Sequence, residues 1–210
     1  MNKLLKITGI AVLSIGAVWT LLTVWAERIG PKRSWTLGNR AATKRALIIY
    51  DPDPFYDLDE QVSRSFGQAL ADGGMHVTIA SVAAADLYVR QPMDLYVFCA
   101  NTYNFRPDWA VGDFIKKQPN LAGKSVVAIT IGSGSTEASQ KALETLVQSK
   151  KADLLDSHSL WLLKPNDESH GTESNVAVAV SMAYAWGEKL AKQHLTDSAV
   201  SASLQPIHQP

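Results

Sequence analysis

Residues 46–57, ALIIYDPDPFYD, decide the fold of this chain. The first five form a short continuous apolar run, which is typical of a strand buried on both faces of a sheet. The seven residues that follow carry three carboxylates and two prolines. Leu58, Val62, Phe66 and Leu70 then recur at helical spacing. The stretch therefore predicts a strand, a loop and an amphipathic helix, with Asp57 as the helix cap.

The same alternation of strand and helix continues along the chain. Further strands are predicted at residues 76–80, 94–100, 125–131 and 158–164, with helices near 108–117, 136–151 and 176–190. This order predicts an α/β fold, in which right-handed crossovers place helices on both faces of a parallel sheet. We expect a three-layer α/β/α domain with a five-stranded parallel sheet. Ligands of such sheets bind beyond the carboxyl ends of the strands.

The N-terminal segment is apolar enough to lie in a membrane rather than in water. No charged residue occurs from Ile7 to Ala26, and about twenty apolar residues are what a helix needs to cross a membrane. A cleaved signal peptide is the alternative, with Val24-Trp25-Ala26 as a small-residue cleavage motif. The apolar stretch is longer than the usual core of a signal peptide, and this favours a retained transmembrane helix.

The flanking cations predict the orientation of that helix. Two lysines precede it, and six basic residues lie between Arg28 and Arg45. Because positive residues prefer the cytoplasm, we expect a single-pass protein with its N-terminus outside and a cytoplasmic soluble domain. The predicted organisation is an anchor at 1–28, a juxtamembrane linker at 29–43, a domain at 44–195 and a disordered tail at 196–210.

The overall composition excludes some classes of function. Among 210 residues, 46% are hydrophobic, and twenty basic residues balance twenty acidic ones. No global field favours nucleic acid as a partner. The single cysteine, Cys99, lies in an apolar run and is interpreted as a buried core thiol. No Cys/His pattern indicates zinc, and the aspartates of the first loop are interpreted as a solvated turn rather than a magnesium site.

Element order and loop placement over residues 44–193 resemble the flavodoxin-like superfamily. The resemblance implies the strand order 2-1-3-4-5 and flavin mononucleotide (FMN) as the ligand. In that superfamily, the phosphate lies in the loop after the first strand, and the flavin ring lies between the loops after the third and fourth strands. The implied contacts are Asp53, Phe55 and Tyr56 in the first loop, Asn101, Thr102, Tyr103 and Asn104 in the third, and Gly132, Ser133, Gly134 and Ser135 in the fourth.

The first loop departs from the pattern of that superfamily. The expected Ser/Thr-x-Thr-Gly-x-Thr is replaced by Asp-Pro-Asp-Pro-Phe-Tyr. Pro52 and Pro54 have no N–H to donate, and Asp51 and Asp53 repel a phosphate. Two unit charges 4 Å apart cost on the order of 4 kcal/mol at an effective dielectric constant of about 20. The fourth loop, by contrast, offers glycines and a helix N-terminus, for which Ser135 is the expected cap.

Two functions therefore stay open from the sequence. The first is FMN-dependent electron transfer or NAD(P)H/quinone-type reduction, with the membrane and a quinone or redox protein as partners. In this case Tyr103 would stack on the flavin ring, although no general acid or base is identifiable. The second is a non-enzymatic flavodoxin-like domain that has lost flavin and binds a protein or another ligand.

Overall fold

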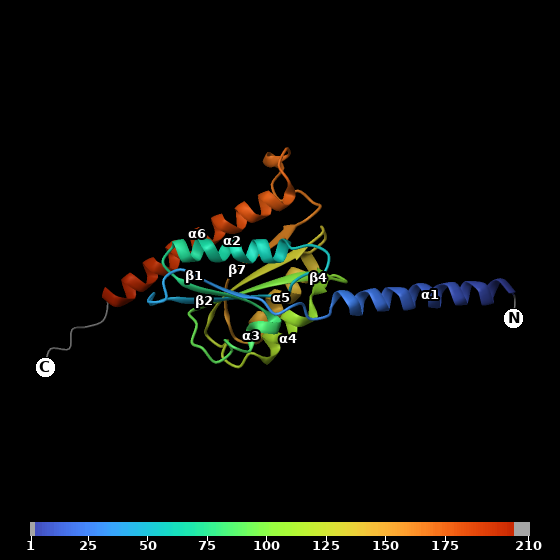
Figure 1. The fold of residues 1–210 in the computed structure, drawn as a ribbon, viewed down its shortest axis with the longest axis horizontal. Coiled ribbons are helices and arrows are strands. Elements are labelled where there is room, and N and C mark those ends of the chain that lie inside the picture. Colours follow the sequence, from blue (N-terminus) through green and yellow to red (C-terminus); the bar gives the residue numbers. More distant parts are fainter. Residues whose placement is uncertain (1–2, 204–210) are drawn as a thin grey trace.

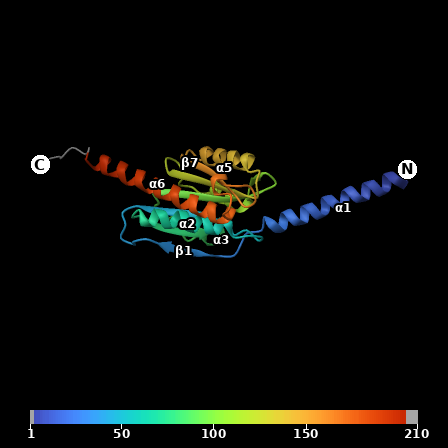
Figure 2. The same ribbon diagram turned by 90° about the horizontal axis from the view of Figure 1, so that it is seen from above.

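The structure is a computed structural model that describes residues 3–203. A long helix, α1 (Lys3–Ala26), precedes a domain in which one sheet lies between two layers of helices (Figure 1). On one face of the sheet, α2 (Leu58–Asp72) packs against α6 (Asn175–Ser203). The other face is covered by α3 (Val82–Ala85), α4 (Trp109–Lys117) and α5 (Glu137–Ser149), and Figure 2 shows the same layers from above.

Five parallel strands form the main part of the sheet. They are β2 (Arg45–Tyr50), β3 (His76–Ser81), β4 (Leu95–Tyr103), β6 (Ser125–Gly132) and β7 (Asp153–Trp161). Their spatial order is β3-β2-β4-β6-β7, so the predicted order 2-1-3-4-5 is confirmed. Because the strands are parallel, their carboxyl ends meet at one edge of the sheet. We call this edge the strand-end rim and define it as residues 27–31, 51–57, 103–109, 132–136 and 161–164.

Part of the segment predicted as a linker belongs to the sheet instead. Within residues 29–43, β1 (Ser34–Leu37) pairs antiparallel with β3 at the edge of the sheet. Trp35 and Leu37 pack against the core, and the guanidinium of Arg64 lies 3.7 Å from the centre of the Trp35 ring. Only two residues of this four-residue strand point to the core, which is too short a pattern to detect from sequence.

Two other boundaries differ from those predicted. β4 continues through Tyr103 and turns back as β5 (Arg106–Pro107), so the expected loop at 101–107 is mostly a β-hairpin. β7 begins at Asp153 rather than at His158. It is the edge strand, and its mixed exposed and half-buried residues lack the continuous apolar run of a central strand.

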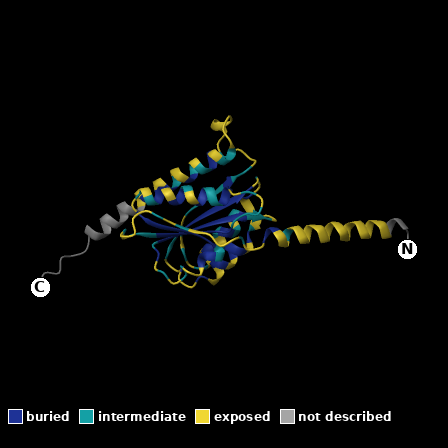
Figure 3. Ribbon diagram, viewed as in Figure 1, coloured by how far each residue is buried: buried dark blue, intermediate teal, exposed yellow. Residues whose placement is uncertain are grey.

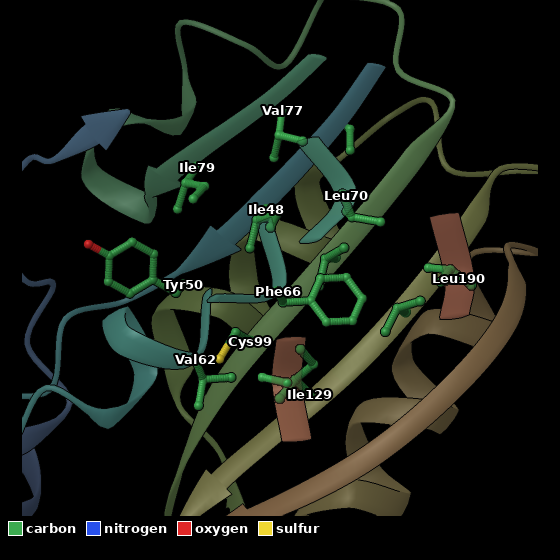
Figure 4. Close-up of a cluster of buried hydrophobic side chains, with 14 of the residues drawn as sticks. Ile48, Tyr50, Val62, Phe66, Leu70, Val77, Ile79, Cys99, Ile129 and Leu190 are labelled. Carbon is green, nitrogen blue, oxygen red and sulfur yellow. The ribbon is translucent and has the colours of Figure 1, made fainter. Parts of the chain in front are cut away.

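The core consists of two layers, one on each face of the sheet, and β2 contributes side chains to both. Ile48 and Tyr50 face α2 and α6, whereas Leu47 and Ile49 face α3, α4 and α5. Figure 4 shows the first of these layers, in which Phe66 of α2 packs beside Leu190 of α6. This burial on both faces is the physical reason for the continuous apolar run in the sequence.

The α1 helix projects away from the domain. Its segment Lys6–Ala26 has 21 residues and a mean hydropathy of 2.0, and none of the most apolar window is buried (Figure 3). One helix of the described chain is therefore long and apolar enough to cross a membrane. At the other end, α6 continues through Thr196–Ser203, part of the segment predicted as a disordered tail. Residues 204–210 of that predicted tail lie outside the described residues.

A short 3-10 helix, η1 (Glu168–His170), lies in the connection between β7 and α6. Asp167 caps it by accepting a hydrogen bond from the backbone N–H of Ser169 at 2.8 Å. This connection is exposed, and its side chains pair mainly with one another.

Candidate functional site

The first loop folds around the carboxylate of Asp53. Its Oδ1 accepts hydrogen bonds from the backbone N–H groups of Phe55, at 2.6 Å, and Tyr56, at 3.2 Å. Its Oδ2 accepts a hydrogen bond from the hydroxyl of Tyr103, which reaches across from the end of β4. A side chain of the loop therefore holds the donors that such a loop would otherwise offer to an external anion.

Asp59, in the first turn of α2, also holds the first loop in place through hydrogen bonds. Its Oδ2 accepts from the backbone N–H of Asp53 at 2.9 Å and from Nδ2 of Asn101 at 3.0 Å. The same Nδ2 donates to the carbonyl oxygen of Asp51 at 2.9 Å. Asp57 occupies the N-cap position of α2, but its side chain makes no capping bond and instead accepts from Gln61. The predicted cap therefore has the right position but not the expected hydrogen bond.

Asp108 ties the β4–β5 hairpin to the start of α4. Its carboxylate accepts from the N–H of Asn101 and the N–H of Val111, both at 2.8 Å, and it is the N-cap of α4. These two donors lie on either side of the hairpin. Asp108 thus fixes the third strand-end loop in place, as a buried positioning residue within the rim.

Burial perturbs the acidity of this group of carboxyls. Loss of hydration raises the pKa of Asp59 to about 7, although hydrogen bonds from Asn101 oppose the shift. It raises the pKa of Asp51 to about 6, against the opposing hydrogen bond from Gly30. The pKa of Asp108 is raised well above its usual range for the same reason. Near neutral pH these three carboxyls therefore carry less negative charge than their number indicates.

The segment that follows α1 crosses the rim and contacts two of its loops. The N–H of Gly30 donates to Asp51 at 3.0 Å. The carboxylate of Glu27 accepts from the N–H of Trp109 at 2.7 Å, and burial raises the pKa of Glu27. A Cβ on Gly30 would lie 2.8 Å from the ring of Pro52, so the close crossing requires glycine. The segment that follows α1 is therefore part of the site.

The β4–β5 hairpin turns through two residues with positive φ. Asn104 has φ of 48° and Phe105 has φ of 62°, a pairing typical of a two-residue type I′ turn. Asparagine tolerates this conformation, whereas a bulky aromatic residue adopts it at a cost in strain. Phe105 is also 66% exposed, so the domain does not use its ring for packing.

The fourth loop differs in detail from the expectation. Thr136, not Ser135, is the N-cap residue of α5, and its hydroxyl accepts from Nε1 of Trp161 at 2.7 Å rather than capping the helix. Gly132 is required because a Cβ there would lie 2.5 Å from the side chain of Thr136. Ser133 and Ser135 are exposed, which leaves this loop accessible from solvent.

Three cavities adjoin the rim. One of about 440 Å³ lies between the segment that follows α1 and the first loop, lined by Arg33, Pro54 and Glu60 among others. A second, of about 630 Å³, lies between α3 and α4, and a third, of about 380 Å³, between α4 and α5. None of these three is lined by Tyr103 or Gly134, between which a flavin ring was expected.

Comparison with solved structures decides the fold. The chain is similar to a flavodoxin from the domain Archaea, with 14% identity, a TM-score of 0.52, and coverage of 70% of this chain and 99% of that one. It has a flavodoxin-like fold. A flavodoxin from Megasphaera elsdenii gives 15% identity and a TM-score of 0.52, covering 70% of this chain and 98% of that one. The flavodiiron protein from Giardia intestinalis gives 13% and 0.57, and the match covers 74% of this chain but 37% of that longer one.

These likenesses show the flavodoxin-like fold alone. No family model and no curated protein matches the sequence. The flavodoxin and flavodiiron neighbours associate the fold with flavin-dependent electron transfer in those proteins, and the cofactor of this chain has to be judged from its own loops.

The first loop of this flavodoxin-like domain does not fit the phosphate of FMN. Pro52 and Pro54 have no N–H group, and the N–H groups of the three other residues from Asp53 to Tyr56 already donate to carboxylates. To reach these donors, a phosphate would have to displace the Asp53 carboxylate, and the two negative charges would repel each other at close range. The sequence already shows the negative charges and the two prolines without donors. The structure adds that the remaining N–H donors of the loop are occupied.

The structure brings together some of the predicted site residues and separates others. The first and third loops meet, because Asp53 bonds Tyr103 and Asn101 lies beneath them. Asn104 turns away to donate to Thr23 of α1 at 3.2 Å. The buried hydroxyl of Thr102 and the buried Oδ1 of Asn101 have no hydrogen-bond partner among the described residues. Within the part of the chain that the structure describes, the predicted residues of the fourth loop make no hydrogen bond to Asp53 or Tyr103.

Four residues of the site were missed by sequence reasoning: Glu27, Gly30, Asp59 and Asp108. From the sequence, Asp59 falls at a predicted helix start, Glu27 in the predicted anchor at 1–28 and Gly30 in the predicted linker at 29–43. A signal did exist for Glu27, which is the first charged residue after the apolar segment and the only acid before Asp51.

Proposed function

We propose that this chain is a membrane-anchored flavodoxin-like binding domain that works at the bilayer surface without FMN. The observation that carries the proposal is the closure of the first loop by the Asp53 carboxylate, which accepts from Phe55, Tyr56 and Tyr103. Because the N–H donors of the loop are already used, the loop has none left to bind a phosphate.

The proposed place of action is the cytoplasmic surface of a membrane, through a single-pass α1. Support comes from the length and hydropathy of the segment Lys6–Ala26 and from the two cations before it against six after it. Directly after α1, Glu27 bonds Trp109 and Gly30 bonds Asp51, so residues 27–31 are joined to two other segments of the rim. A tether of this kind holds the domain at a fixed position near the membrane and raises its effective concentration there.

The groove of about 630 Å³ between α3 and α4 is the best ligand site of the three cavities. Val82, Trp109 and Phe114 are among its apolar lining residues. Its charged lining residues are Glu27, Asp86, Asp113 and Lys117. Apolar walls with a few polar groups are typical of sites for small molecules or for a side chain of a partner protein.

A second candidate function is FMN-dependent electron transfer or NAD(P)H/quinone-type reduction, with a quinone or redox protein as partner. The open fourth loop, with Ser133 and Ser135 exposed, favours it, as does the association of the fold with flavin in the flavodoxins. Bound FMN would supply the redox chemistry. The residues available to hold it would be Tyr103, Gly132 and Gly134, with the phosphate outside the first loop.

The visible spectrum of the purified full-length chain in detergent distinguishes the two. We expect colourless protein whose spectrum and thermal midpoint do not change when FMN is added. Yellow protein that retains FMN through gel filtration would overturn the first proposal in favour of the second.

A pair of variants tests the stated reason for the absence of FMN. Asp53→Ser removes the internal carboxylate and frees the N–H groups of Phe55 and Tyr56, so weak binding of FMN or inorganic phosphate should appear. Asp57→Ser removes an exposed charge from the same loop without freeing either donor and should bind neither. Equal behaviour of the two variants would contradict the account.

A further inference from the structure

The end of α1 is fixed to the rim at three separate points. Glu27, directly after the helix, bonds Trp109 of α4. Within the helix, Thr23 accepts from Asn104, and the ring of Trp25 meets that of Phe55 edge-on, with centroids 5.0 Å apart. The domain is therefore held against the helix end and not suspended on a free linker.

These contacts set the depth of the rim relative to a bilayer. A span of 21 residues is about 31 Å long at 1.5 Å per residue, close to the roughly 30 Å of hydrocarbon in a membrane. If Ala26 lies at the boundary of the hydrocarbon, then Thr23 lies about 4–5 Å inside it. Loop residues that contact Thr23 and Trp25 must then lie at the level of the headgroups.

The rim gathers the exposed apolar side chains of the domain. Outside α1, eight large hydrophobic side chains of the described residues are exposed, and five lie on the rim: Ile29, Phe55, Phe105, Trp109 and Leu163. Three of the five are aromatic. Such a collection beside a spanning helix is typical of residues that enter a membrane interface.

Phe105 gives an additional indication. It occupies a positive-φ position at the tip of the hairpin, where asparagine or glycine is preferred, and it is 66% exposed. Both the backbone strain and the exposed ring are unfavourable in water. Because no packing within the domain offsets these terms, the compensating contact is expected from outside it.

The charges on the rim agree with a lipid surface. The guanidinium of Arg28 lies 4.8 Å from the centre of the Trp25 ring, and the ammonium of Lys164 lies 4.2 Å from that of Trp161. Cations beside aromatic rings are suited to lipid phosphates at the interface. Among the rim acids, Asp51 and Asp108 are buried. Asp57 is exposed and must remain in water, which limits insertion to the loop tips.

We propose that the strand-end rim docks on the bilayer into which α1 inserts, with Phe55 and Phe105 entering the boundary between headgroups and acyl chains. In Figure 1 and Figure 2, α1 leaves the domain at one end and extends away along its long axis, so this end faces the membrane. The inference rests on the proposed anchoring by α1, and it does not depend on whether FMN binds.

Nitroxide labels on the full-length chain in vesicles of phosphatidylcholine and phosphatidylglycerol test the proposal. One label replaces Phe105 (Phe105→Cys), and the reference label replaces Asn120 (Asn120→Cys), in the exposed turn that precedes β6 at the opposite end of the sheet. Cys99 is buried and does not compete for the reagent. We expect the Phe105 label to collide with oxygen more often than with a water-soluble nickel complex, and the Asn120 label to show the reverse.

A second arm tests the role of the aromatic side chains. Phe55→Ser should move the Phe105 label towards water, whereas Leu155→Ser, at an exposed apolar position within β7, should not. Water-like collision ratios at both labels, or equal effects of the two serine variants, would overturn the proposal. Protection of the Phe105 label from both reagents would also contradict it, because a protein and not lipid would then cover the rim.

Extraction of the same samples with alkaline carbonate tests separately whether α1 anchors the chain. If alkaline carbonate extracts the chain from the vesicles, α1 does not span them and the proposed function itself fails. A chain that resists extraction but shows a water-exposed Phe105 label would retain its anchor and lose only the docking.

Discussion

The hydroxyl of Tyr103 donates a hydrogen bond to the carboxylate of Asp53, joining the ends of two neighbouring strands. In the resemblance to flavodoxins, these two residues were expected to contact opposite ends of one cofactor. In this chain they contact each other, and the side chain of Asp53 uses the donors of the loop. This contact is the reason for expecting an FMN-independent function.

Removal of that contact should weaken the domain. Tyr103→Phe deletes one donor to a partly buried carboxylate, which typically costs about 1–3 kcal/mol of unfolding free energy. We expect a lower thermal midpoint for the full-length variant in detergent. Tyr184→Phe is the matched control, because the Tyr184 hydroxyl also donates to an aspartate, Asp72, but on an exposed surface. A midpoint equal to that of the control would contradict the structural role of Tyr103.

Stability should fall as the pH rises from about 4 to about 7. Burial raises the pKa of Asp59 to about 7 and that of Asp51 to about 6 in the folded chain, above the value of about 4 expected for an unfolded aspartate. Between these values the folded state binds more protons than the unfolded state, so raising the pH favours unfolding. Denaturation midpoints measured at half-unit intervals across this window check the slope.

The pH dependence should be traceable to a particular carboxyl. Asp59→Asn cannot titrate and should flatten the slope between pH 5 and pH 7, because the raised pKa of Asp59 is about 7. Asp57→Asn changes an exposed aspartate two positions earlier and should leave the slope unchanged. An unaltered slope in Asp59→Asn would assign the effect to other groups.

Gly30→Ala should weaken the packing of the segment that follows α1 against Pro52. The added Cβ would lie 2.8 Å from the Pro52 ring and 2.9 Å from its carbonyl oxygen, and backbone atoms there cannot yield easily. Overpacking of this kind typically costs about 1–3 kcal/mol. Gly134→Ala adds the same methyl group where the nearest atom is 4.0 Å away, and it should be tolerated. Faster proteolysis between α1 and β2 in the first variant alone would agree with this expectation.

The orientation of the domain can be measured in intact cells. With two cations before α1 and six after it, a cysteine introduced at Asn120 should resist a membrane-impermeant maleimide until the cells are permeabilised. Labelling before permeabilisation would place the domain outside and reverse the predicted topology. The buried Cys99 gives the background level in the parent chain.

The sequence predicted the architecture because burial of a strand on both faces leaves a signal that is local. The apolar run at 46–50 and the helical spacing from Leu58 to Leu70 each require only neighbouring residues. Short or half-exposed elements leave no such signal, so the sequence pattern predicts a linker where β1 lies and places the start of β7 too late.

The chemistry of the rim depended on contacts between distant segments. The sequence by itself determined that the first loop carries carboxylates and prolines where a phosphate loop needs donors, and that an apolar helix precedes the domain. Only the tertiary structure decided that Asp53 meets Tyr103, fifty residues away, and that Gly30 meets Asp51. The physical reason is that charge and hydrogen-bonding capacity belong to each residue, whereas the partner that satisfies them is fixed by how the strands and α1 come together at the rim.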